Sequence, residues 1–277
     1  MKVLKHIFDF YINSSIHVSL AVVSLSWLTL LEFGVEYDKN MLYFIFFASI
    51  TGYNFVKYFG LARFHHRSLA IWLREIQVFS FFCFLLMCFY MFRIETKTLF
   101  YVLGCGVLTF LYAIPLLPKR LFLDSQQNLR SISGLKIYII ALVWSGVTVF
   151  LPLVNNGVSL ESSEVIITGI QRFVLVIALT IPFEIRDLQY DSLKLSTIPQ
   201  KMGVRQTKII GVLLSALFFV LEFFKEEVTL KSIVILLGVT MTTIFFVVFS
   251  DENQREYYSG FWVEGIPILW LLLVLTF

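Results

Sequence analysis

Nine apolar stretches follow one another along the sequence, and each is about as long as a helix that crosses a membrane. Roughly 20 apolar residues are needed to cross about 30 Å of hydrocarbon as a helix. In lipid every backbone N–H and C=O must find a partner within the protein, so such stretches predict helices. The sequence therefore predicts an all-α, multi-pass membrane protein with nine transmembrane helices near residues 11–32, 41–62, 76–93, 98–117, 132–154, 165–185, 207–224, 230–250 and 261–277.

The composition supports a bilayer as the surroundings of this chain. Of its 277 residues, 58% are hydrophobic and 15% are charged, against about 25% charged residues in a typical soluble domain. The formal net charge of +3 is too small for the basic surface that nucleic acid requires, so we expect no nucleic-acid partner. The three cysteines lie inside apolar stretches without metal-ligand or disulfide spacing, and we interpret them as packing residues: Cys83, Cys88 and Cys105.

The positively charged residues are distributed unequally between the two sets of alternate connections. Of the 22 Lys and Arg residues, 14 fall in the N-terminal segment and in the connections 63–75, 119–130, 186–208 and 251–260. Five fall in the intervening connections and three inside the apolar windows. Because loops on the cytoplasmic side collect Lys and Arg, the sequence predicts a protein of the cytoplasmic (inner) membrane with its N-terminus inside and its C-terminus outside.

The connections are short, and no soluble domain, long linker or low-complexity tract separates the apolar stretches. We therefore expect one transmembrane domain over residues 1–277. The longest connection, near residues 186–206, follows the sixth window. It lies in the sequence IPFEIRDLQYDSLKLSTIPQKMG, residues 181–203, which turns abruptly from apolar to charged.

Three acids of this stretch share one helical face if the sixth span stays helical to its end. Glu184, Asp187 and Asp191 are spaced i, i+3 and i+7. Carboxylates so placed suit Mg²⁺, which proteins hold through one or two carboxylates together with substrate phosphates. Basic residues of the same stretch would then bind the remaining phosphate oxygens, namely Arg186, Lys194 and Lys201. The alternative is an interfacial loop in which these charges only pair with one another and end the helix.

The order of residues in the stretch resembles the second aspartate motif of the UbiA-type intramembrane prenyltransferases. The matching pattern is R-D-x-x-x-D-x-x-K-x-x-T-I-P-x-x-x-G, and its letters are Arg186, Asp187, Asp191, Lys194, Thr197, Ile198, Pro199 and Gly203. The resemblance covers nearly the full length, because that family has nine membrane helices with charged motifs after the second and the sixth. It implies a UbiA-like bundle and a donor bound as the Mg²⁺ complex of its diphosphate.

A shorter resemblance lies in the loop after the fourth span. The segment YAIPLLPKR, residues 112–120, resembles the family's Tyr, Pro, Lys segment through Tyr112, Pro115 and Lys119 or Arg120. This resemblance implies that Lys119 and Arg120 contact the diphosphate of the donor.

The sequence departs from the family at the first aspartate motif. There the family has an Asn followed by Asp-x-x-x-Asp, whereas this chain reads TGYNFVKYFGLARFHH from residue 51. Asn54 has the expected place, but the acids that should follow it are replaced by such residues as Lys57 and Tyr58. We expect Asn54 and Lys57 to bind the diphosphate, with Lys57 acting as a point charge without a bridging cation. The alternative for Lys57 is a snorkelling lysine whose ammonium group reaches the lipid headgroups.

Several polar and aromatic residues inside the windows carry separate expectations. Lys136, at the start of the fifth span, is either a phosphate ligand or a snorkelling residue. In the sixth span, Gln171 and Arg172 are expected to make a buried contact between helices. Three aromatic residues are candidates to shield an allylic cation through their π faces, namely Tyr53, Tyr138 and Trp144.

Two functions stay open at this point. The first is transfer of a prenyl group from an isoprenyl diphosphate to a hydrophobic acceptor, aromatic or lipid. In it Asp187, Asp191 and Lys194 are the catalytic residues, and the two aspartates hold Mg²⁺. The second is a non-catalytic UbiA-like membrane protein that binds lipid or a partner, which the loss of the first acids favours. The acceptor, the chain length of the donor and the oligomeric state depend on pocket shape rather than on a motif.

Overall fold

The computed structural model describes residues 2–58, 69–114, 134–189 and 197–277, and every regular element within them is helical. The elements are α1 (Lys2–Asn13), α2 (Ile16–Glu32), α3 (Lys39–Tyr58), α4 (Leu69–Met91), α5 (Thr96–Ala113), α6 (Lys136–Ser145), the π-helical η4 (Gly146–Phe150), α7 (Leu151–Asn155), α8 (Ser163–Asp187), α9 (Ile198–Leu221), the 3₁₀ turn η6 (Glu222–Phe224), α10 (Leu230–Val248), the π-helical η7 (Tyr258–Val263) and α11 (Ile266–Thr276).

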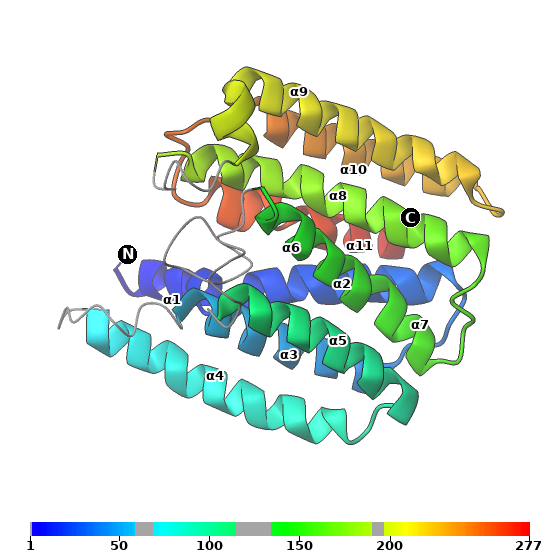
Figure 1. Ribbon diagram of the computed structural model, residues 1–277, viewed down its shortest axis with the longest axis horizontal. Coiled ribbons are helices and arrows are strands. Elements are labelled where there is room, and N and C mark those ends of the chain that lie inside the picture. Colours follow the sequence, from blue (N-terminus) through cyan, green and yellow to red (C-terminus); the bar gives the residue numbers. More distant parts are fainter. Residues whose placement is uncertain (1, 59–68, 115–133, 190–196) are drawn as a thin grey trace, which may run out of the picture.

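The helices run back and forth along one direction, as Figure 1 shows, and each predicted apolar window coincides with one of these helical segments. In the described part of the chain, seven segments are long and apolar enough to cross a membrane, and the bent pair α1 and α2 makes an eighth. The remaining window is α3, which has 20 residues but carries Lys39 and Lys57 near its two ends. The all-helical membrane bundle is thus confirmed, while the count of nine spans stays a prediction.

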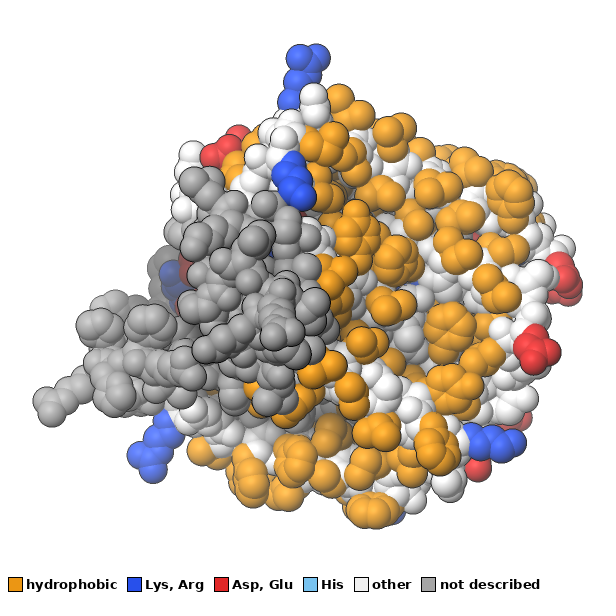
Figure 2. All heavy atoms as spheres, viewed as in Figure 1, with side chains coloured by type: hydrophobic (Ala, Val, Ile, Leu, Met, Phe, Trp, Pro, Cys, Tyr) orange, Lys and Arg blue, Asp and Glu red, His pale blue; other side chains and the backbone are white. Residues whose placement is uncertain are grey.

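Burial separates one central helix from the lipid-facing ones. In α8, 72% of the apolar window is buried, against 11% in α4 and in α5. The helix packs against α6, α9 and α10. Figure 2 shows hydrophobic side chains over the middle of the described face, with charged side chains near its two ends. This distribution is the one that a bilayer requires, and it places the helix with the charged motif at the centre of the bundle.

Helix α1 leaves the bundle direction and is amphipathic. It meets α2 at an angle of 50°, and the corner is formed by Ser14 and Ser15, both fully buried. Val3 and Leu4 on α1 remain 73% and 74% exposed, whereas Tyr11 is turned inward to bond the His17 ring. An apolar face left open on a helix that lies across a bundle is typical of a helix in the membrane interface.

One end of the bundle gathers the elements that carry the charged motif. We call it the motif end, and Figure 1 shows it on the same side as the N-terminus. It is formed by the C-terminal ends of α3, α5, α8 and α10 and by the N-terminal ends of α2, α6, α9 and η7. Residues widely separated in the sequence are therefore brought to one place.

The T-I-P-x-x-x-G part of the motif has a local physical explanation at the start of α9. Pro199 occupies the first turn, where its missing N–H would have no helical partner in any case. The N–H of Thr197 donates to Gln200 Oε1 at 3.0 Å. Four residues after Pro199, Gly203 has φ 80 and ψ 160, a conformation that only glycine adopts readily, and the helix is kinked there. These residues start the helix and then redirect it.

Candidate functional site

The last turns of α8 place two acids on one face, toward the start of α6. Helix α8 continues through Pro182 to Asp187. Lys136 Nζ lies 2.9 Å from Glu184 Oε1 and 3.8 Å from Asp187 Oδ2. One cation thus contacts both carboxylates, and the expected helix extends through both of them to Asp187, while Asp191, the third acid, lies outside the described residues. Lys136 is neither turned to the headgroups nor free, because its ammonium group is held inside the bundle.

Asp187 is also bound by the residue before it. The guanidinium group of Arg186 approaches Asp187 Oδ1 through Nε and Nη2, each at 2.8 Å. The side chain of Asp187 is 27% exposed, and that of Arg186 is 35% exposed. Both groups therefore remain within reach of a ligand that enters the motif end, although each now satisfies the other.

The end of α3 holds a hydrogen-bond network in place of the missing acids. Lys57 Nζ donates to Ser15 Oγ at 2.9 Å, and Ser15 Oγ donates to Asn54 Oδ1 at 2.8 Å. Asn54 Nδ2 donates to the carbonyl oxygen of Ser14 at 2.9 Å and to Ser80 Oγ at 2.7 Å. The network joins the α1–α2 corner, α3 and α4.

The network gives different surroundings to Asn54 and Lys57, which the sequence analysis both expects to bind the diphosphate. All polar positions of the Asn54 amide are used within the protein, and Asn54 is 3% exposed. Lys57 is exposed and bonds only Ser15 among the described residues. Its ammonium group turns toward the α1–α2 corner rather than outward, so Lys57 does not behave as a snorkelling lysine. Of the pair, Lys57 is the one placed to meet a ligand.

An acid that the sequence analysis missed interacts with residues of both α3 and α8 at the motif end. Glu264, just before α11, interacts electrostatically with Lys57 of α3 and with Arg186 of α8. It is half-buried, and no described residue forms a hydrogen bond or an ion pair with its carboxylate. The signal that points to it is an acid inside the ninth apolar window, since an ionisable residue in a membrane span marks a functional site by default.

Two of the three proposed aromatic residues lie together near these charges. Trp144 Nε1 donates to Tyr53 Oη at 2.6 Å, and the two rings meet edge to face. Tyr53 also interacts electrostatically with Glu264 and Tyr112. Tyr138 is 46% exposed and joins none of them. Tyr53 and Trp144 thus contact each other inside the bundle, whereas Tyr138 faces the surroundings; shielding of an allylic cation stays a prediction.

Of the remaining predicted residues, Lys201 lies on α9 with an exposed side chain, whereas Asp191, Lys194, Lys119 and Arg120 lie outside the described residues. Among the described residues, three cations from three helices and three acids interact with one another at the motif end. The cations are Lys57, Lys136 and Arg186; the acids are Glu184, Asp187 and Glu264.

The donor set was tested for its fit to Mg²⁺. In the described ranges no group of three or more His, Cys, Asp or Glu side chains could hold a metal ion. Asp187 offers hard carboxylate oxygens beside two cations that suit phosphate. Asp187 would therefore hold Mg²⁺ only together with the phosphate oxygens of a ligand, and not in a site made of the described protein ligands alone.

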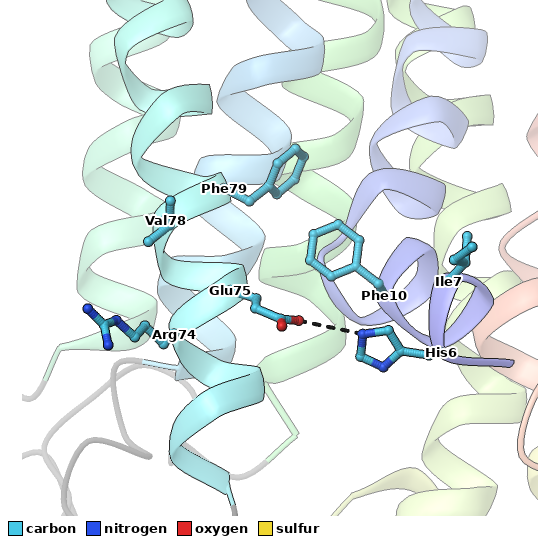
Figure 3. A pocket seen from close by; sticks show the side chains of 7 residues that line it. All are labelled: His6, Ile7, Phe10, Arg74, Glu75, Val78 and Phe79. Atoms are coloured by element: carbon cyan, nitrogen blue, oxygen red, sulfur yellow. Dashed lines mark ion pairs between the residues drawn. The ribbon is translucent and has the colours of Figure 1, made fainter. Parts of the chain in front are cut away.

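A groove of about 630 Å³ lies between α1 and α4 on the outer side of this region. Figure 3 shows Glu75 and Phe79 pointing from α4 toward His6 and Phe10 of α1, with an ion pair of 3.6 Å between Glu75 and His6. The rings of Phe10 and Phe79 meet edge to face with centroids 5.5 Å apart. The groove lining is mainly apolar, and it does not include the charged residues described above.

The polar residues in the middle of α8 make the buried contact that the sequence predicts. Gln171 Nε2 donates to the Phe218 carbonyl oxygen at 3.1 Å and to Glu222 Oε2 at 3.0 Å. Arg172 Nη2 donates to Thr29 Oγ1 at 3.3 Å, and its guanidinium group lies over the Trp270 ring. These contacts join α8 to α2, α9 and α11, and they lie away from the motif end.

Comparisons with known proteins were made for the sequence and for the fold. No protein-family model and no curated protein sequence matches the chain. The apo structure of a UbiA homolog from Aeropyrum pernix K1 matches with a TM-score of 0.68 at 14% identity, over 94% of this chain and 98% of that chain.

Two further solved structures match the fold. A UbiA homolog from Archaeoglobus fulgidus bound to GPP and Mg²⁺ has a TM-score of 0.61 at 16% identity, over 95% of this chain and 94% of that one. A digeranylgeranylglyceryl phosphate synthase has a TM-score of 0.58 at 16% identity, over 99% and 98%. At this identity the likeness establishes the fold, which is therefore that of UbiA homologs along nearly the whole chain.

Proposed function

We propose that the protein is a member of the UbiA-type intramembrane prenyltransferases, divergent in its first aspartate motif, and that residues 1–277 form one such domain. In this proposal it transfers a prenyl group from an isoprenyl diphosphate to a hydrophobic acceptor. The proposal is carried by one observation: Lys57, Lys136 and Arg186 come from three helices to the end of the bundle where the α8 aspartate motif begins. The fold supports it, because a solved neighbour is bound to GPP and Mg²⁺.

The donor would be bound by an exchange of ionic partners. Arg186, which now contacts Asp187, would turn to the phosphate oxygens, since cations bind phosphate through charge-assisted hydrogen bonds, and Lys136 would add its positive charge from its place beside Glu184. The freed Asp187 would then hold Mg²⁺ together with Asp191, and Lys194, Lys119 and Arg120 would add further contacts to the diphosphate. Mg²⁺, when bound, supplies additional neutralisation of the charge on the leaving group.

The chain's own residues would assist the chemistry in two places. As the bond between the allylic carbon and the diphosphate oxygen breaks, its electron pair stays on the diphosphate, where Lys57 and Arg186 stabilise the developing negative charge. The allylic cation left behind would lie against the rings of Tyr53 and Trp144, whose π faces attract a cation. A carbon or oxygen of the acceptor then forms the new bond and loses a proton.

The experiment uses membranes that contain the full chain. Labelled geranyl and geranylgeranyl diphosphates are added with and without Mg²⁺, and the release of diphosphate is measured. We expect Mg²⁺-dependent release that Asp191→Asn abolishes without unfolding the protein. Absence of both binding and release would contradict the proposal.

The second candidate is a non-catalytic UbiA-like membrane protein that binds lipid or a partner. The observation that favours it is the pairing of Asp187 with Arg186 and Lys136, together with the loss of acids at the end of α3. It predicts that neither donor loses its diphosphate under any metal condition. The same assay therefore separates the two candidates.

A further inference from the structure

The α3 side of the proposed donor site is organised by a buried corner of the chain. Ser15 connects α1 to α2, is fully buried and has φ 67. In the described ranges it is the one residue other than glycine with a positive φ. A left-handed conformation is unfavourable for a serine, and such strain persists only where the surrounding structure fixes it.

The hydrogen bonds of Ser15 define the direction of each proton. Asn54 Nδ2 faces the carbonyl oxygen of Ser14, which can only accept, so Asn54 Oδ1 must face Ser15. The hydroxyl of Ser15 therefore donates to Asn54 and can only accept from Lys57. This fixes the ammonium group of Lys57 at one point while leaving two of its N–H groups without a partner among the described residues.

No described acid forms an ion pair with Lys57. Glu264 attracts it electrostatically and also acts on Arg186, which in turn repels Lys57. An ammonium group that is held in place by Ser15 and has no ion-pair partner among the described residues is prepared to bind an anionic oxygen. Since phosphate oxygens accept charge-assisted hydrogen bonds from lysine, a diphosphate satisfies this group without a metal ion.

We propose that Ser15 is a positioning residue that directs Lys57 toward the donor, so that the α3 half of the site binds the diphosphate without a divalent cation. Asn54 then acts through Ser15 and does not touch the donor. This inference rests on the proposed function, and it goes further by assigning Mg²⁺ to the α8 half alone. A site of this kind keeps part of its affinity for the donor when the metal is removed.

The experiment measures equilibrium binding of labelled geranyl diphosphate to the purified full chain, in excess Mg²⁺ and in EDTA. We expect the wild type to bind in both conditions, more weakly in EDTA. Lys57→Met should abolish the binding that remains in EDTA. Ser15→Ala should weaken it about tenfold or more, because a hydrogen bond to a charged group is lost. Ser26→Ala is the matched control, since Ser26 is a buried serine of α2 whose hydroxyl bonds only the Val22 carbonyl oxygen.

Ser15→Gly separates positioning from folding. Glycine adopts φ 67 without strain, so the backbone conformation is retained or relaxed while the hydroxyl is removed. We expect this variant to unfold at no lower temperature than Ser15→Ala and to lose EDTA-resistant binding to the same extent. If Ser15→Gly or Lys57→Met binds the donor in EDTA as the wild type does, Ser15 has no positioning role.

The outcomes distinguish this inference from the proposed function. If the wild type binds geranyl diphosphate in Mg²⁺ and shows no binding in EDTA, the inference is overturned and the proposed function is left intact. A wild type that does not bind geranyl diphosphate in either condition overturns both.

Discussion

Lys136 on α6 and Glu184 on α8 form an ion pair with 2.9 Å between Nζ and Oε1, and their side chains are 15% and 3% exposed. The pair fastens two helices at the motif end, and the same ammonium group also contacts Asp187. A buried carboxylate that loses its cation is strongly destabilised. This contact therefore links the stability of the bundle to the orientation of the α8 motif.

The first prediction concerns this pair. Lys136→Met should lower the free energy of unfolding by about 3–5 kcal/mol, because the ion pair that neutralises the buried Glu184 carboxylate would be removed. The measurement is a denaturant titration of the purified protein in micelles. The double variant Lys136→Met with Glu184→Leu should recover part of the loss. Strict additivity of the two single changes would show that the pair is not coupled.

The second prediction concerns the end of the bundle opposite the motif end. Lys225, 4% exposed, lies within ion-pair distance of both Glu32 and Glu222, at 2.9 Å from Glu222 Oε2. Lys225→Met would leave two acids without their cation, and we expect the free energy of unfolding to fall by about 3–5 kcal/mol.

The control for Lys225→Met is binding of the donor. Lys225 follows η6, at the end of the bundle opposite the aspartate motif. The folded fraction of the variant should therefore bind geranyl diphosphate as the wild type does. A selective loss of donor binding at unchanged stability would contradict a structural role for this cluster.

The third prediction concerns pH. Tyr257, outside the spans, donates to Asp9 Oδ1 at 2.6 Å, and this hydrogen bond raises the pKa of the Tyr257 phenol from 10.0 to about 12. The folded state thus favours the neutral phenol. Its contribution to anchoring α1 is complete below pH 10 and is lost as the pH rises from about 10 to about 12.

Absorbance titration of the phenolate tests this pH dependence, with Tyr257→Phe used to assign the signal. Asp9→Asn removes the charged acceptor and should bring the pKa of Tyr257 down toward 10. An ionisation of Tyr257 near pH 10 in the wild type would show that the bond to Asp9 does not form.

The fourth prediction concerns orientation in the membrane. The distribution of Lys and Arg predicts that the motif end faces the cytoplasm. Ser159, exposed between α7 and α8, and Asn253, exposed between α10 and η7, lie in connections at opposite ends of the bundle. In a chain whose three native cysteines are replaced by alanine, an impermeant maleimide should label Ser159→Cys in intact cells. It should label Asn253→Cys only after the membrane is opened, and the reverse pattern would invert the topology.

The helices could be predicted from the sequence because lipid imposes one solution on an apolar stretch. Within the described residues each of the nine windows forms a helical segment, and the spacing of Glu184 and Asp187 correctly placed them on one face. The T-I-P turn and Gly203 also act locally, so their roles follow from the sequence. The apolar windows did not reveal that α3 is lower in hydropathy than the other spans. Its lower hydropathy is partly due to Asn54 and Lys57, which build the hydrogen-bond network at its end.

The partners of the site residues could not be predicted, because they come from distant parts of the chain. Lys136 lies 48 residues before Glu184 in the sequence, and its position on α6 alone allowed either a phosphate ligand or a snorkelling lysine. Ser15 bonds residues 39 and 42 positions away. Glu264 was hidden within an apolar window. Periodicity reports which face a residue occupies, but not which helix that face meets.

The central claim is that the carboxylates at the end of α8 serve a diphosphate donor, and one measurement tests it most directly. Diphosphate release from labelled geranylgeranyl diphosphate is compared in the wild type, Asp187→Asn and Asp191→Asn, each with and without Mg²⁺. The account predicts release by the wild type in Mg²⁺ and a loss of about 10²-fold or more in each variant, with thermal unfolding unchanged. Release at the wild-type rate in both variants would contradict it.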